Sequence, residues 1–220
     1  MTETTISVQG HHSAWYKAER ATVVVSIAFD GPQREPVFAS ATAALDAVRE
    51  TVLSRHDTSA GPITWWSADS VRVWSERPWN NEGKQLDPVH HAALDVNAKF
   101  KDFEALANWI ELVVAIPGAN IGGISWALTD ATATSATTEV RSRAVKDAVA
   151  KATVYAQSIG LGSVTATAIA DPGMLGDSSS GGSPVVMDRM MAKFGGAPTI
   201  ELKPEELEVS ASVDARFIAR

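Results

Sequence analysis

The sequence predicts an α+β fold, and three observations predict it. A long helix between two β-prone segments carries small residues at every fourth position, which places them on one helical face. Residues 207–217 alternate between apolar and polar side chains, as a strand that is wet on one face does. Residues 20–128 have the element order βαββαβ of a ferredoxin-like portion. The small residues of the helical face are Ala144, Ala148, Ala152 and Ala156.

The first half of the chain yields four elements. A short strand candidate, residues 5–10, stops at Gly10, and a stronger one follows over residues 20–30 before Gly31-Pro32 ends it. Apolar residues at three- and four-residue steps predict a helix over residues 35–54 that packs through Phe38, Ala41, Leu45, Val48 and Val52. Residues 63–76 are rich in Trp and Val and predict a strand. Its alternation slips near residues 67–70, which indicates a bulge.

The second half begins with a strand over residues 89–100 that is wet on one face. Asp102 is the expected N-cap of a helix that packs through Phe103, Leu106, Ile110 and either Val113 or Val114 and extends to about residue 115. A strand over residues 121–128 follows. Asp130 or Thr132 is then expected to cap the long helix, and a further strand ends near residue 171.

These elements predict one unit over residues 1–220 with two sub-lobes. The βαββαβ portion, residues 20–128, forms one sub-lobe. The other combines residues 5–10 with residues 131–220, where the long alanine-rich helix packs on a second small sheet of the N-terminal and late strands. A Gly/Ser/Pro-rich loop, residues 172–198, belongs to this second sub-lobe.

Composition narrows the function classes. The net charge of −7 and the absence of any basic run argue against a nucleic-acid partner. Zero cysteines exclude disulfides, thiolate metal sites and a Cys nucleophile. No stretch approaches the roughly 20 apolar residues of a membrane span. The N-terminus lacks the basic and apolar regions of a signal peptide, so we expect a cytoplasmic protein.

No pattern predicts catalysis, a cofactor or a metal. Two adjacent histidine pairs, His11-His12 and His90-His91, could meet only if the first and fourth strands lay close, and neighbours on a strand point to opposite faces. Neither a GxSxG nucleophile turn nor a phosphate-binding loop is present. We therefore expect a protein that is not an enzyme, with no catalytic, cofactor-binding or metal-binding residue. An unrecognised hydrolase is the weakest alternative.

Aromatic and methionine residues give the candidate interaction surface. Trp65 and Trp66 must face opposite sides of their strand, so one is left for a sheet surface, a subunit contact or a small-molecule pocket. A later cluster at helical spacing either docks on a neighbouring subunit as an apolar latch or folds back onto its own sheet. We favour subunit contact. The candidate interface residues are Trp65, Trp66, Trp79, Met187, Met190, Met191 and Phe194.

Four features together resemble the SIMPL domain family of bacterial proteins. They are an opening Ile-x-Val-x-Gly strand, a Gly-Ala-Asn turn that enters a strand, the alanine-rich helix that closes on Leu-Gly, and the final alternating strand. The residues that carry the first three are Ile6, Val8, Gly10, Gly118, Ala119, Asn120, Gly123, Ile124, Trp126, Arg143, Ala144, Asp147, Ala148, Lys151, Ala152, Ala156, Leu161 and Gly162.

The resemblance implies an α+β protein with no established catalytic residues, ring-like homo-oligomers and links to stress responses. No active-site residue is carried over, because the shared motifs are of a structural kind. Gly118 and Asn120 suit a turn that needs positive φ, and Gly160 and Gly162 suit the end of the long helix in the same way. The expected function is a self-assembling cytoplasmic protein. The alternative is a small-molecule binding module with a Trp-lined pocket.

Overall fold

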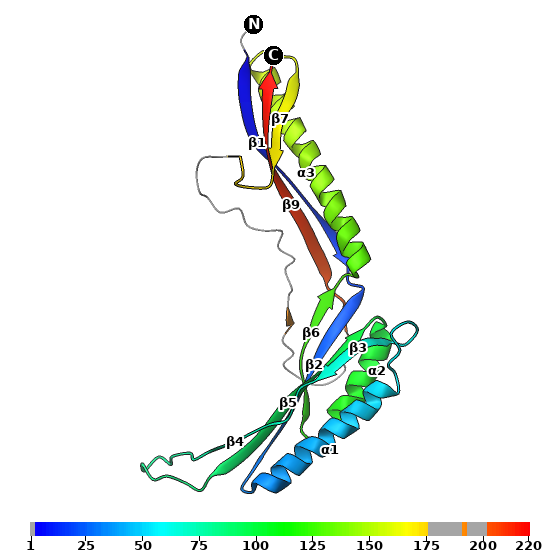
Figure 1. Cartoon of the computed structure of the whole chain (residues 1–220), viewed down its shortest axis with the longest axis vertical. Helices are drawn as coiled ribbons and strands as arrows, with labels where there is room; N and C mark the ends of the chain where they lie inside the picture. The colour runs from blue at the N-terminus through cyan, green and yellow to red at the C-terminus, as the bar shows by residue number, and fades with distance from the viewer. Residues whose placement is uncertain (1–2, 176–190, 193–201) are drawn as a thin grey trace. The chain divides into compact units, whose positions relative to one another are not determined.

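The computed structural model describes residues 3–175, 191–192 and 202–220, and these residues cluster into two compact units. Unit 1 contains β1, α3, β7 and β9, and unit 2 contains the other eight elements. The α+β prediction is confirmed, because each unit combines an antiparallel sheet with helical structure (Figure 1). The prediction of a single 1–220 unit with two sub-lobes stays a prediction.

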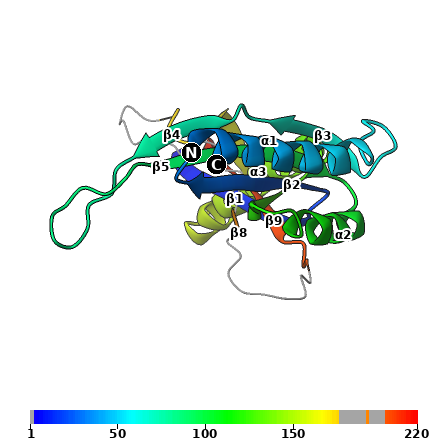
Figure 2. The ribbon, with the colours of Figure 1, turned by 90° about the horizontal axis from the view of Figure 1, so that it is seen from below.

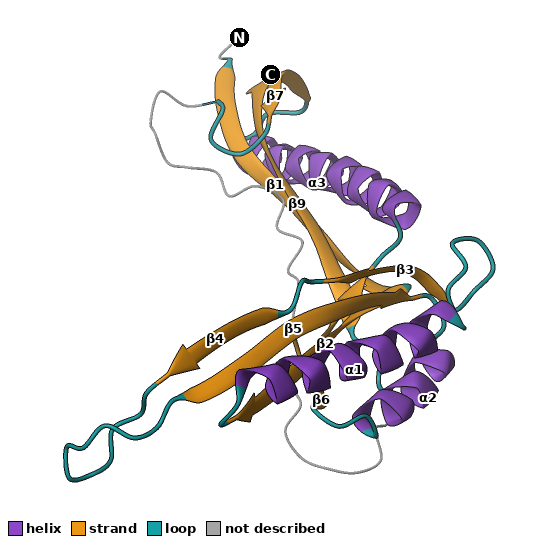
Figure 3. Cartoon of the chain, turned by 60° about the horizontal axis from the view of Figure 1, so that its bottom comes forward, coloured by secondary structure: helices purple, strands orange, loops and turns teal. Residues whose placement is uncertain are grey.

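Unit 2 has the predicted ferredoxin-like order. Its strands pair antiparallel in the order β3-β5-β2-β6-β8, and β4 pairs with β5 beyond the end of β3. The helices α1 and α2 lie side by side on one face of this sheet (Figure 3). The elements are β2 (Arg20–Gly31), α1 (Arg34–Leu53), β3 (Ile63–Ala68), β4 (Arg72–Glu76), β5 (Val89–Phe100), α2 (Phe103–Val114), β6 (Ala119–Ala127) and β8 (Met191–Ala192).

Strand alternation decides what the helices of unit 2 cover. Val23, Val25 and Ile27 of β2 lie opposite Ala98, Val96 and Leu94 of β5, and all six are buried. We call this the covered face of the unit 2 sheet. The intervening residues of β5 are polar or small and only partly buried, so the β5 pattern is the one that the sequence predicts.

Three details of unit 2 differ from the sequence predictions. The 63–76 segment is two strands separated by residues 69–71 rather than one. Ala68 pairs with Val96 and Arg72 with Ala93, so one extra residue lies between the two strands, where the sequence predicts a bulge. A second register shift, between Ile63 and Trp65, was not predicted. Phe38 of α1 is half exposed, because Val37 takes the buried position instead. Trp109 of α2, which the helical pattern missed, is fully buried. Its indole Nε1 donates to Thr51 Oγ1 at 2.9 Å.

The N-cap prediction for α2 is confirmed. Asp102 accepts hydrogen bonds from the amides of Glu104 and Ala105 at 3.0 Å each. These two amides belong to the first helical turn, where no backbone carbonyl is in reach, so the carboxylate satisfies donors that would otherwise lack a partner.

Unit 1 is one helix on a three-stranded antiparallel sheet of order β1-β9-β7. The predicted second small sheet of N-terminal and late strands is therefore confirmed. Its elements are β1 (Thr4–Lys17), α3 (Asp130–Ser158), β7 (Val164–Ala170) and β9 (Glu206–Ala219). The cap of α3 is Thr129, one residue before the predicted Asp130. Its side chain accepts from the amide of Thr132.

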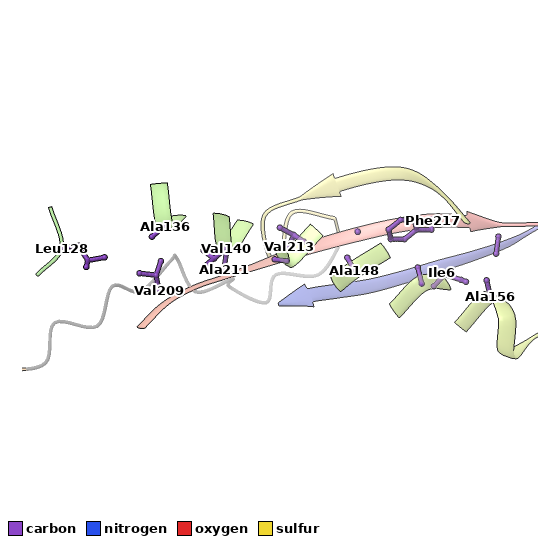
Figure 4. Packing of buried hydrophobic residues seen from close by; sticks show 14 residues of the cluster. Ile6, Leu128, Ala136, Val140, Ala148, Ala156, Val209, Ala211, Val213 and Phe217 are labelled. Atoms are coloured by element: carbon purple, nitrogen blue, oxygen red, sulfur yellow. The ribbon is translucent and has the colours of Figure 1, made fainter. Parts of the chain in front are cut away.

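The alanine face of α3 packs on this sheet as predicted. Ala136, Val140, Ala144, Ala148, Ala152 and Ala156 are all buried, and they face the apolar residues of β1 and β9 (Figure 4). Phe217 supplies the largest fully buried side chain of the unit. Small side chains on the helix leave room for this ring while the helix axis stays close to the strands.

Gly10 does not end a strand, so that prediction is wrong. It lies within the 14-residue β1, directly under α3. A Cβ at Gly10 would be 2.0 Å from the carbonyl oxygen of Ala144 and 2.8 Å from the Cβ of Ala148. Only a residue without a side chain fits this approach, and the strand continues past it.

The glycine turns are partly as expected. Gly118 and Gly160 have positive φ, 77° and 80°, whereas Asn120 and Gly162 do not, so those two predictions are wrong. Asn120 is already part of β6, where an extended backbone is required. A Cβ at Gly118 would also approach the ring of Phe29 to 2.4 Å.

Candidate functional site

The exposed tryptophans of unit 2 lie on the face of its sheet that α1 and α2 leave uncovered. Trp65 pairs with Lys99, and Trp74 pairs with His91, so both side chains project from the same face. Each is 47% exposed. We call this the open face and define it by Trp65, Trp74, His91 and Lys99, together with Asp95.

Each of the two tryptophans has one polar partner across the strands. The Lys99 ammonium lies 5.7 Å from the centroid of the Trp65 ring, a cation–π distance. The Trp74 and His91 rings stack at 5.2 Å with an interplanar angle of 17°. These contacts fix the orientation of the two indoles and leave nearly half of each one at the surface.

Trp66 lies on the opposite face from Trp65, as strand alternation predicts. It pairs with Ala98 of the covered face and is partly buried. Of the two neighbours, Trp65 is therefore the more exposed.

Ionisable residues beside Trp74 form only simple pairs. Glu76 Oε1 lies 3.4 Å from His91 Nε2, and Asp95 Oδ1 accepts a hydrogen bond of 2.7 Å from Ser26. The carboxylates of Glu76 and Asp95 thus add negative charge to the face that carries the Lys99 ammonium. Neither pair presents a proton donor and acceptor that converge on a common substrate position.

A serine and a histidine meet on the covered side of the β4–β5 pair. Ser75 Oγ lies 2.6 Å from His90 Nδ1. Sequence spacing did not reveal this pair, because the two residues are joined only by the register of β4 on β5. Within the described ranges no carboxylate bonds to His90, so the orienting third member of a nucleophilic triad is lacking.

The histidine pairs are engaged locally. His11 shares a hydrogen bond of 3.1 Å with Ser212 in unit 1, while His90 and His91 point to opposite faces of β5 in unit 2. Over residues 3–175, 191–192 and 202–220, no three His, Asp or Glu side chains are grouped as metal ligands would be.

The loop between β4 and β5 projects beyond the strands and carries Trp79 (Figure 2). Trp79 is 67% exposed, and Leu86 beside it is also exposed. The Asn80 side chain accepts from the amides of Glu82 and Lys84 at 3.0 and 2.8 Å, and Gly83 has positive φ. The tip of the loop is therefore an ordered turn, stabilised by the Asn80 side chain, and the Trp79 indole projects from it.

The remaining candidate interface residues fall outside the described part of the chain or at its margin. Met187, Met190 and Phe194 lie outside the described residues. Met191 is described only by its backbone, which pairs with Ser125 as the first residue of β8. The latch hypothesis therefore stays a prediction.

Unit 1 holds a further exposed tryptophan and an ion pair against a strand edge. Trp15 of β1 is 62% exposed, a position that the sequence analysis missed because it ended β1 at Gly10. Asp147 and Lys151 of α3 form an ion pair of 2.7 Å. The pKa of Asp147 is lowered, first by its hydrogen bond with Lys151 and then by the amide of His11.

No helix of the described chain combines the length and apolar character that a bilayer crossing requires. A comparison with protein families matches residues 6–217 to one family model, described as SIMPL, protein of unknown function (DUF541). A comparison with curated proteins finds no match. The family match spans both units, and no residue role comes with it.

Proposed function

Because the chain belongs to the SIMPL (DUF541) family, we propose that it is a non-enzymatic protein that assembles with further copies of itself. The observation that carries the proposal is the exposure of Trp65, Trp74 and Trp79 on ordered strands and a built turn of unit 2. Tryptophan is the residue type most enriched at the energetic centres of protein interfaces.

The size of the exposed surface supports a protein partner. A tryptophan buries about 150–250 Å² when it is covered, so three half-exposed indoles leave roughly 300 Å² of apolar area. A standard interface buries about 800 Å² on each partner, with an aromatic centre and a polar rim. The charged residues of the open face, Asp95 and Lys99 among them, would form part of that rim.

Light scattering over a range of protein concentrations tests the proposal. We expect a mass above that of one chain, which is 23.3 kDa. Trp65→Ser and Trp74→Ser should each weaken assembly by about tenfold or more, as loss of an interface hot spot does. Phe38→Ser on α1, an equally exposed aromatic away from the open face, is the matched control and should change nothing. A protein that is monomeric at every concentration defeats the proposal.

The Trp74–His91 stack favours a second candidate function, a small-molecule binding module. A planar ligand could extend this stack, since one face of the indole already lies on a ring at 5.2 Å. Intrinsic tryptophan fluorescence during a metabolite screen separates the two candidates. A monomer whose fluorescence shifts with a compound, and whose Trp74→Ser variant does not respond, supports binding over assembly.

A cytoplasmic location and a role in stress are further parts of the proposal. Cell fractionation tests the first. Growth of a deletion strain under oxidant and heat tests the second. Neither result bears on whether the purified protein assembles.

A further inference from the structure

The two edges of the unit 1 sheet differ in what bonds to their outward backbone groups. At the β1 edge, the Lys151 ammonium donates to the Gln9 carbonyl oxygen at 3.0 Å, and the His11 amide donates to Asp147 Oδ2 at 2.8 Å. The ion pair of α3 thus takes the place of the amide and carbonyl that a neighbouring strand would supply. A foreign strand cannot pair here without displacing it.

The β7 edge has no comparable cover among the residues that the structure describes. Ser163 and Arg220 exchange both backbone hydrogen bonds, at 3.0 and 3.1 Å. In an antiparallel ladder bonded and non-bonded pairs alternate, so the backbone groups of Val164 and Ala166 point away from β9. Those of Ile169 do as well, because its partner on β9, Ala215, bonds to β1 instead. No described residue hydrogen-bonds to these outward groups.

The side chains of β7 offer no protection either. The strand reads VTATAIA, without a charged residue or a proline, which are the usual means of blocking a sheet edge. Thr165, Ala166 and Thr167 are exposed, and Ile169 is 51% exposed. The middle of the β1 edge is therefore blocked by the ion pair, and no described residue blocks the β7 edge in the same way.

We propose that β7 pairs antiparallel with β7 of a second copy of this chain. The inference rests on the proposed self-assembly and names one of its contacts. The lack of charge argues for a second copy, because identical strands then meet without like-charge repulsion, and a charged peptide would find no counter-charge. A two-fold axis makes such a contact self-complementary and closed.

A seven-residue edge is a small contact. It falls below the roughly 1,200–2,000 Å² that a stable interface buries. The β7 pairing therefore adds to a larger assembly rather than holding two chains together alone. Loss of the β7 contact should weaken the assembly without abolishing it.

Two substitutions in the full-length protein test the contact. Ala166→Pro removes an amide hydrogen that no bond within the monomer uses, and edge strands accept proline at such positions. Ile169→Lys adds a charge beside the edge. Val154→Lys, at an exposed site of α3, is the control with the same added charge. We expect each edge variant to raise the dissociation constant about tenfold, and the control to leave it unchanged.

Circular dichroism melts decide which variants are folded. If Ala166→Pro unfolds, Ile169→Lys alone tests the contact.

A single introduced cysteine shows whether β7 meets β7 of another copy, because the chain has no other cysteine. Ala166→Cys, near the middle of the strand, should give a covalent dimer on mild oxidation, and Val154→Cys should not.

The outcomes separate this contact from the proposed function. A wild type that stays monomeric refutes self-assembly and the β7 contact with it. An oligomer that survives both edge substitutions overturns the β7 contact alone. Assembly that weakens without any Ala166→Cys dimer overturns the pairing of β7 with itself and assigns the edge to a different strand.

Discussion

Gly10→Ala tests the closest approach in unit 1. The added Cβ would lie 2.0 Å from the Ala144 carbonyl oxygen and 2.8 Å from Ala148. Ordinary non-bonded separation is about 3.5 Å, so α3 must move out by roughly 1 Å or more. Neither of the nearest atoms, which belong to helix backbone and Cβ, can rotate away. We therefore expect the upper end of the overpacking cost, about 3 kcal/mol.

The same displacement weakens the whole alanine face. A gap of about 0.5–1 Å forfeits roughly a quarter to a half of the dispersion energy of each contact. For a chain of this size a loss of 3 kcal/mol lowers Tm by about 6–12 °C. Because the chain has two compact units, hydrogen exchange of peptides from residues 130–158 is the more direct assay. Exchange there should accelerate, and that of α1 and α2 should not.

Two control variants sharpen the result. Gly162→Ala places a Cβ at 3.9 Å from its nearest neighbour and should be neutral or stabilising by up to about 1 kcal/mol. Adding Ala148→Gly to Gly10→Ala removes one clash but leaves the Ala144 carbonyl in place, so it should rescue little. A Gly10→Ala protein as stable as Gly162→Ala, with unchanged exchange in α3, would refute the close packing described for unit 1.

Three further predictions concern stability. Gly118→Ala should cost about 2 kcal/mol or more in a urea titration, from its positive φ and the aromatic ring that its Cβ would meet. Asp147→Asn should cost about 1 kcal/mol or less, since the carboxylate is one-third exposed. Because the pKa of Asp147 is lowered in the folded state, the carboxylate stabilises the fold fully above its ordinary pKa of about 4. That stabilisation is lost as pH falls through the lowered pKa. In pH-dependent melts the difference in stability between Asp147→Asn and wild type should therefore shrink at acidic pH. Trp109→Phe should cost about 1–3 kcal/mol in the same titration, because the fully buried ring becomes smaller and the half-buried Thr51 hydroxyl loses its indole donor.

How far the sequence predicted the fold depends on the range of the interaction. Local patterns placed the helices, the Asp102 cap and the alternation of β5, because each is decided within a few residues. Gly10 was misjudged because its reason lies more than 130 positions away, on α3. A glycine that ends a strand and a glycine that a helix crosses look alike until the partner of the strand is known.

The candidate site was predictable in kind but not in detail. Alternation alone placed Trp65 and Trp66 on opposite faces. The stack of Trp74 on His91 was not predictable, because it depends on the register of β4 against β5. Trp15 was missed with the second half of β1.

The residues that mark the family and the residues that would make its contacts are different sets. Gly10, Gly118 and the alanines of α3 are fixed by close packing, where a single added methyl group has no space. The exposed tryptophans and the β7 edge meet no such constraint within one chain. Beyond its contact with Lys99 or His91, each strand indole leaves nearly half of its surface in water. In the proposed assembly a second copy would cover it, and assembly variants at these positions should leave the stability of the monomer nearly unchanged.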